Sequence, residues 1–348
     1  MSSGDVEGGG NGGGEVEQTL VEAALEVLNT ADPVEKARIG EAAASRWLRG
    51  DICQPYRDGG GHPDPLPVPE RPARLSGVKL VPSHLMPKLG KGGSLHSRQA
   101  ILHSLVHTES WAIDLSWDII ARFGKQESMP LDFFTDFVRV AQDEGRHFTL
   151  LAARLRELGS YYGAFPAHDG LWDSAMKTST DLLARLAIEH CVHEARGLDV
   201  LPTTISRFRN NGDECTAKLL ETVVYPEEIT HCAAGIKWFR YVSLRTTTFV
   251  PCSIHCQEPA VKACDPDAAI DQCPNQTLES CKTTDNSQDD IVIHMFHATV
   301  RGYFRGSLKP PFNKEARNIA GFTPDWYEPL AGSENVEWIP VDLSCTKL

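Results

Sequence analysis

The chain has 348 residues, of which 41% are hydrophobic and 23% charged, and its formal net charge is −13. This composition is typical of a globular protein with enough chain for one large domain or two smaller ones. The sequence holds no apolar run long enough for a transmembrane helix, and no basic cluster that would attract nucleic acid to so acidic a chain. Residues 1–17 resemble neither a secretion signal nor a transit peptide. We therefore expect a cytoplasmic protein without nucleic-acid or membrane partners.

Composition and hydrophobic periodicity divide the chain into five expected segments. Residues 1–16 are rich in glycine and expected to be disordered, residues 17–94 hold two helices and a Pro-rich extended stretch, residues 95–245 hold four long helices, residues 246–290 form a flexible insert with cysteines, and residues 291–348 form a helix and tail that pack on the four helices. The expected fold class is all-α.

Capping residues and helix breakers set the expected ends of these helices. Asp32 is the expected cap of the second N-terminal helix. The first long helix is expected over residues 95–123. The second is expected to follow Ser128 as its cap, with Pro130 in its first turn, and to end before Gly159.

The remaining helices follow a longer crossover around residues 159–170. The third long helix is expected from about residue 171 to residue 200, with Pro202 as its breaker. The fourth is expected from about residue 213 to residue 242, and a last helix from about residue 290 to residue 304.

In each of the four long helices, apolar residues spaced alternately three and four apart form one stripe that we expect to face the core. Near the middle of each stripe stands one glutamate, and these are Glu109, Glu144, Glu194 and Glu228. A buried carboxylate without a partner is costly, so four of them need a shared explanation. A cluster of metal cations between the helices supplies it.

Two histidines extend this pattern. Glu144 and His147 form a Glu-x-x-His pair, and so do Glu228 and His231; residues three apart lie on one helical face, so both side chains of a pair can reach one metal ion. The first and third helices give one glutamate each. The glutamates are 35 residues apart in the first helix pair and 34 in the second. This arrangement is that of the ferritin-like four-helix bundles, in which the helices hold two metal ions.

Other side chains close to these positions are alternative ligands. His190, His193 and Glu189 flank the third-helix glutamate, and His103 and His107 precede the first. We favour Glu109 and Glu194 because they fit the stripes and the repeated spacing. The alternative role of the extra histidines is to form hydrogen bonds with neighbouring polar groups or backbone.

Several stretches of the chain resemble the DUF455 family of ferritin-like proteins. They are His107-Thr108-Glu109, Ala141–Phe148, Tyr162–Trp172, His193–Asp199, Glu227–His231, Phe304–Asn313 and Tyr327–Leu330. The resemblance extends over about residues 18–340, and the insert and the Gly-rich start depart from it. It implies a ferritin-like fold with additional terminal helices and the same six ligands, and it supplies no reaction.

Carboxylate oxygens with one imidazole per metal suit iron or manganese better than zinc or copper. We therefore expect two iron ions, with manganese or a mixed manganese–iron pair as the alternative, bound by Glu109, Glu144, His147, Glu194, Glu228 and His231. The leading hypothesis is an oxygen-dependent oxidase or hydroxylase whose partners are a small-molecule substrate and dioxygen or peroxide. The sequence leaves open whether the chain forms a homodimer.

Two other functions remain as alternatives. The first is a peroxide-scavenging or iron-handling ferritin-like protein, which is disfavoured in its rubrerythrin-like form because the sequence has no Cys-x-x-Cys iron site. The second is a metal-free helical scaffold that binds a partner, which leaves four buried carboxylates without cations.

Some remaining residues have a functional and a structural interpretation. The insert could bind zinc through Cys252, His255 and Cys256, although its spacing favours a flexible segment. Tyr225 and Tyr241 could be redox-active but are expected to pack, and Cys191 and Cys232 are expected to be small core residues. A basic group, Arg301, Arg305 and Lys309, could contact an anionic substrate or balance the acidic end of the helices.

Overall fold

The structure is a computed structural model that describes residues 18–57, 67–248 and 280–332. Within these ranges the regular secondary structure is helical apart from one isolated β-bridge between Leu80 and Ala167, which confirms the all-α class. None of the described helices combines the length and the apolar character that crossing a membrane requires. The chain divides into two compact units, residues 1–79 with 103–165 and residues 80–102 with 166–348.

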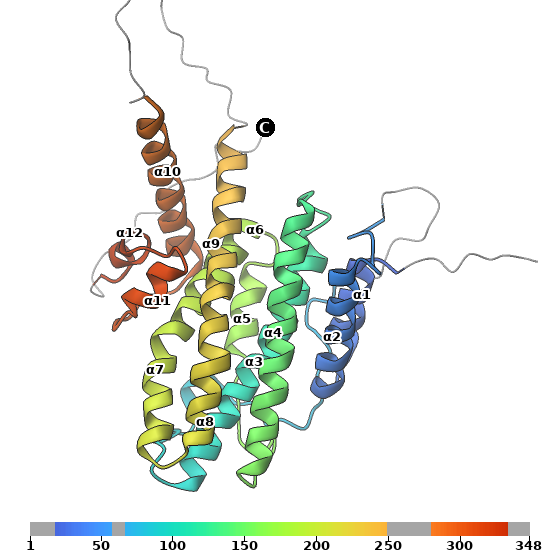
Figure 1. Ribbon diagram of the computed structural model, residues 1–348, viewed down its shortest axis with the longest axis vertical. Helices are drawn as coiled ribbons and strands as arrows, with labels where there is room; N and C mark the ends of the chain where they lie inside the picture. The colour runs from blue at the N-terminus through green and yellow to red at the C-terminus, as the bar shows by residue number, and fades with distance from the viewer. Residues whose placement is uncertain (1–17, 58–66, 249–279, 333–348) are drawn as a thin grey trace, which may run out of the picture. The chain divides into compact units, whose positions relative to one another are not determined.

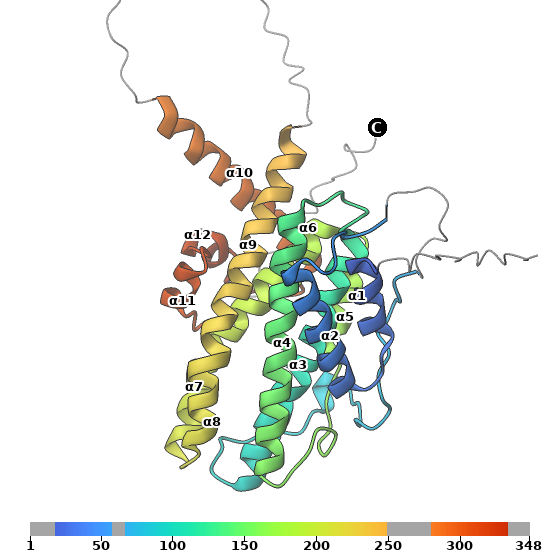
Figure 2. The ribbon, with the colours of Figure 1, turned by 45° about the vertical axis from the view of Figure 1, so that its right-hand side comes forward.

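The first unit contains α1 (Leu20–Asn29), α2 (Pro33–Arg49), most of α3 (Leu95–Phe123) and α4 (Leu131–Glu157). The expected bounds of α3 are confirmed. Asp32 caps α2 as expected, since its carboxylate accepts hydrogen bonds from the backbone N–H groups of Val34 and Glu35. Helix α2 packs along α4, and α1 packs on α2 (Figures 1 and 2).

The prediction that Ser128 caps α4 is wrong. Ser128 lies in the turn after α3 with a positive φ of 49°, and its N–H donates to the carbonyl of Lys125. Pro130 itself takes the N-cap position. Because a proline disfavours helical backbone in the residue before it, the helix cannot extend back from Pro130 through Met129 to Ser128.

A buried ion pair ties α2 to α3 within the first unit. The ammonium of Lys36 donates to the carboxylate of Asp114, and the guanidinium of Arg74 bonds the other oxygen of that carboxylate. Lys36 is 1% exposed and Asp114 is fully buried. Burial lowers the pKa of Lys36, and the charge of Asp114 opposes this shift. Because the two opposite charges compensate each other, both side chains can be buried away from water.

The second unit follows a similar plan of paired long helices. Its elements are η1 (Ser83–Leu85), α5 (Gly170–Lys177), α6 (Leu182–Arg185), η2 (Leu186–His193), α7 (Glu194–Asn210), α8 (Glu214–Leu219), η3 (Leu220–Val224), α9 (Tyr225–Thr248), α10 (Ser280–Tyr303), α11 (Lys314–Ile319), α12 (Pro324–Tyr327) and η4 (Glu328–Leu330). Elements α6, η2 and α7 form one continuous helix, as do α8, η3 and α9. Helices α7 and α9 lie side by side (Figures 1 and 2).

The expected bounds of the third long helix are wrong at both ends. Residues 170–177 form a separate helix, and the long helix starts after Asp181, whose carboxylate accepts from the N–H of Ala184. The helix continues through Pro202 to Asn210. A proline cannot donate to the carbonyl four residues before it, here that of Leu198. The side-chain amide of Asn313 donates to this carbonyl instead, at 3.1 Å, which makes the proline tolerable.

The last two long helices are also longer than expected. Asp213 caps the fourth helix as its position suggests, accepting from the N–H of Thr216, but α9 extends to Thr248. Helix α10 begins at Ser280, ten residues before the expected start. Residues 1–17 and 249–279 lie outside the described residues, and with them lie the predictions of a disordered start and of a flexible insert, as well as the alternative of a zinc site in that insert.

Replacing Lys36 tests the buried ion pair. We expect Lys36→Met to lower the free energy of unfolding by about 3 kcal/mol, because Asp114 stays buried with one cationic partner fewer. Chemical denaturation followed by circular dichroism measures this change. The control is Lys125→Met at an exposed position, with an expected change under about 0.5 kcal/mol. Equal losses in the two variants would contradict the prediction.

Candidate metal centre

Three of the expected ligands come together in the first unit. Glu109 lies on α3, and Glu144 and His147 lie one helical turn apart on α4. One ligand atom from each of the three lies within 4.8 Å of those of the other two. The Nδ1 atom of His147 is 3.6 Å from Glu109 Oε2 and 3.5 Å from Glu144 Oε2. All three side chains are buried, so the first cluster, Glu109–Glu144–His147, is shielded from water.

The electrostatics of the first cluster favour a cation. Burial raises the pKa of Glu109 well above its usual value of 4.5, and the charge of Glu144 raises it further. The nearby His147 lowers it but does not compensate. Two carboxylates so close and so far from water cannot both be ionised at low cost, whereas a metal ion between them would stabilise both charges.

The other three expected ligands come together in the second unit. Glu194 opens α7, and Glu228 and His231 lie one turn apart on α9. Their ligand atoms also lie within 4.8 Å of one another, and His231 Nδ1 is 3.9 Å from Glu228 Oε2. Glu228 and His231 are buried and Glu194 is half-buried. The second cluster, Glu194–Glu228–His231, therefore has the same residue types as the first.

Sequence reasoning did not identify the local geometry that builds the second cluster. The segments η2, just before Glu194, and η3, just before the helix of Glu228, are π-helical. Such wide turns shift the side chains that follow them and are frequent at functional sites. A Cβ at Gly235 of α9 would stand 1.9 Å from the carbonyl oxygen of His190, so only glycine lets α9 approach η2 this closely.

The structure gives His103 and His107 other partners. His103 Nε2 accepts from the backbone N–H of Gly163 at 2.9 Å, and burial lowers the pKa of His103 to about 4, so its ring is neutral near pH 7. His107 Nδ1 lies 2.9 Å from the hydroxyl of Tyr162, and Trp111 donates to His107 Nε2 at 3.3 Å. Both histidines thus bond neighbouring groups, which was the alternative to ligation.

The alternative metal ligands in the sequence next to Glu194 lie on η2 and outside the second cluster. Glu189 is buried on η2 with Oε2 3.9 Å from His193 Nε2, and its burial raises its pKa. His190 is buried where η2 meets α9. Among the described residues, the groups of side chains close enough to share a metal ion do not include Glu189, His190 or His193.

The remaining candidates have structural roles. Cys191 and Cys232 are fully buried free thiols, and burial raises the pKa of both, so they stay protonated core residues. The hydroxyl of Tyr225 accepts a hydrogen bond from Asn313 at 2.7 Å. Tyr241 is partly exposed and packs edge-on against Trp238.

Comparison with known proteins places both clusters within the range that one family model matches. A protein of Haemophilus influenzae named "Uncharacterized protein" is 38% identical over 148 residues, which are 41% of this chain and 51% of that protein. The chain thus spans about half the length of this curated relative. No solved structure matches. The family described as "Protein of unknown function (DUF455)" matches residues 29–258, which contain all six clustered side chains, and the chain belongs to this family.

Proposed function

We propose that the two clusters bind the two metal ions of a ferritin-like di-iron centre, and that the chain is an oxygen-dependent oxidase or hydroxylase of a small molecule. The observation that carries this proposal is the repetition of one set of side chains, two glutamates and one histidine, in each unit, with only Glu194 half-buried among the six. In each set a Glu-x-x-His pair on one helix is joined by a single glutamate from another.

The donor atoms fit iron or manganese. Each cluster offers carboxylate oxygens and one imidazole nitrogen, a set that hard and intermediate metal ions prefer. Among the described residues, neither group of side chains close enough to share an ion contains a cysteine, so the thiolate ligation typical of structural zinc sites is missing from both clusters. A divalent ion would also offset the repulsion between Glu109 and Glu144 that raises the pKa of Glu109.

The proposal assigns one ion to each cluster. Glu109, Glu144 and His147 would hold one ion, and Glu194, Glu228 and His231 the other. A bound iron pair of this kind supplies the electrons to activate dioxygen and the oxidising power to attack a C–H bond. Three protein donors per ion leave positions open for exogenous ligands. That the two ions form one centre is supported by the near-equal spacing of the glutamates, 35 and 34 residues, and by the ferritin-like pattern.

Metal content tests the assignment of the ligands. We expect the purified chain to bind two iron ions, and Glu144→Gln and Glu228→Gln each to reduce this to about one ion or fewer, because each change removes a charged ligand. Elemental analysis after anaerobic loading with Fe(II) measures the content. Glu157→Gln, at an exposed position at the end of α4, is the matched control and should keep both ions. Unchanged iron in the two cluster variants would contradict the assignment of the ligands, and a native chain that binds no iron would favour the metal-free scaffold.

Dioxygen uptake tests the reaction class. We expect the chain loaded with Fe(II) to consume dioxygen in a single turnover, and Glu228→Gln to lower the rate by about 100-fold or more, because an incomplete centre cannot deliver electrons in pairs. An oxygen electrode measures the rate. An iron-loaded chain that consumes no dioxygen would contradict the oxidase proposal, and a large shell-forming oligomer would instead favour iron storage.

The pH dependence of metal stabilisation follows from Glu109. Since folding raises the pKa of Glu109 above 4.5, the metal-free folded chain keeps a proton that the unfolded chain loses, and its stability falls as the pH rises from about 4.5 through the raised pKa. A metal ion keeps Glu109 ionised and removes this loss. We therefore expect the rise in Tm on adding Mn(II) to grow between pH 5 and pH 8. Thermal unfolding with and without Mn(II) measures it, and Glu109→Gln should flatten the profile.

A further inference from the structure

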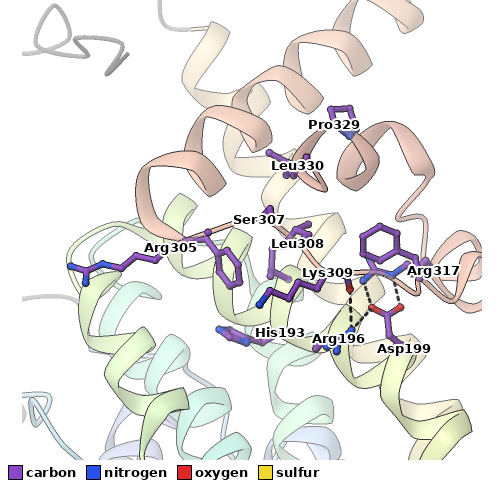
Figure 3. A pocket seen from close by; sticks show the side chains of 15 residues that line it. His193, Arg196, Asp199, Arg305, Ser307, Leu308, Lys309, Arg317, Pro329 and Leu330 are labelled. Carbon is purple, nitrogen blue, oxygen red and sulfur yellow. Dashed lines mark hydrogen bonds and ion pairs between the residues drawn. The ribbon is translucent and has the colours of Figure 1, made fainter. Parts of the chain in front are cut away.

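A cavity of about 610 Å³ lies in the second unit (Figure 3). Val192, His193 and Arg196 form one wall, and the segment Phe304–Phe312 with Leu330 forms the other. Ligand pockets of proteins have volumes of about 300–1,000 Å³. The cavity is therefore large enough for a small organic molecule.

The one carboxylate in this pocket is already neutralised. Both oxygens of Asp199 accept hydrogen bonds from the guanidinium of Arg317, at 2.9 and 2.7 Å, and this pair is almost completely buried. Arg196 is held in the wall, since it donates to the carbonyl of Lys309 at 3.1 Å and lies 3.7 Å from Asp199. The lining thus has an excess of positive charge in a chain whose net charge is −13.

Lys309 is the cation best placed to meet a ligand. Its side chain extends toward His193, whereas Arg305 extends away from both residues (Figure 3). Among the residues that the structure describes, none forms a hydrogen bond or ion pair with the ammonium of Lys309. The ammonium is exposed at the pocket, where an anion could bind it without displacing another partner.

The rest of the lining is apolar. The side chains of Phe304, Leu308, Phe312 and Leu330 line the pocket beside the basic groups, and Leu308 and Leu330 are buried. A ligand that fills this space must combine a charged end with a hydrophobic body. Inorganic ions would leave the apolar surface uncovered, and uncharged hydrocarbons would leave the ammonium of Lys309 without a partner in the pocket.

We propose that this pocket binds a small organic acid, with its anionic head at Lys309 and Arg196 and its hydrocarbon body against Phe304, Leu308 and Leu330. The proposal that the pocket binds this acid rests on the pocket itself and does not depend on the proposed function. Because His193 and Arg196 flank Glu194 in the chain, the acid is also the substrate class of the proposed oxidase, and this second step rests on the proposed function.

Octanoate is the probe for the binding step. We expect isothermal titration of the full chain to show octanoate binding. Butyrate should bind with lower affinity because it covers less apolar surface. Octylamine should bind with an affinity at least tenfold lower because its charge is reversed, which costs about one charge-assisted contact. Lys309→Met should weaken octanoate by about tenfold or more, and Lys309→Arg should retain most of the affinity.

Lys218→Met is the matched control. It removes the same charge from an exposed position on α8, outside the pocket, and should leave octanoate affinity unchanged. Equal affinity for octanoate and octylamine, or equal affinity in Lys309→Met and Lys218→Met, would overturn the proposal.

The substrate step has its own readout. We expect octanoate to bind Glu228→Gln with unchanged affinity, and to accelerate dioxygen uptake in the iron-loaded native chain. If octanoate binds but the rate of dioxygen uptake stays unchanged, the proposed substrate class is wrong, whereas the proposed binding site remains. An iron-loaded chain without any dioxygen uptake would overturn the proposed function instead.

Discussion

Paired carboxylates held away from water are the constraint on which the candidate site depends. Glu109 and Glu144 are both buried, and each raises the cost of ionising the other. Placing such a pair among apolar helix faces lowers stability unless a cation or a proton compensates the charge. The second unit brings Glu194 and Glu228 together in a similar way, with Glu228 buried and Glu194 half-buried. In each pair a histidine lies one turn from one of the glutamates, so each set offers side chains that could bind a cation.

Features that depend on local sequence were predictable from it. The bounds of α3 and the cap Asp32 are confirmed, because capping and hydrophobic periodicity act over one or two turns. The same periodicity selected the two glutamates of each cluster, since burial of a stripe brings a glutamate on it toward the interior, and the Glu-x-x-His spacing added the histidine. Ser128 failed as a cap because a neighbouring proline, another local feature, outweighed the preference of serine for that position.

Features that depend on distant partners were not predictable. Pro202 reads as a breaker until Asn313, 111 positions later in the sequence, is seen to bond the carbonyl of Leu198. Nothing in the spacing of residues 186–193 indicates a π-helix, because its wide turns are stabilised by packing against α9 and the close approach at Gly235. The pocket lining comes from three separated stretches of the chain, so its excess of positive charge appears only after folding.

The segment that lines the pocket also supports the helix of Glu194. Asn313 donates to the carbonyl of Leu198 and, through its backbone N–H, to Asp199, while the carbonyl of Lys309 accepts from Arg196. These bonds fall within the first two turns after Glu194, where Pro202 would otherwise leave the helix weakened. A ligand bound at Lys309 would therefore contact the same backbone that holds this part of α7 in place. The segment Phe304–Asn313 thus contributes both to the lining of the pocket and to the hydrogen bonds on the turns that follow Glu194.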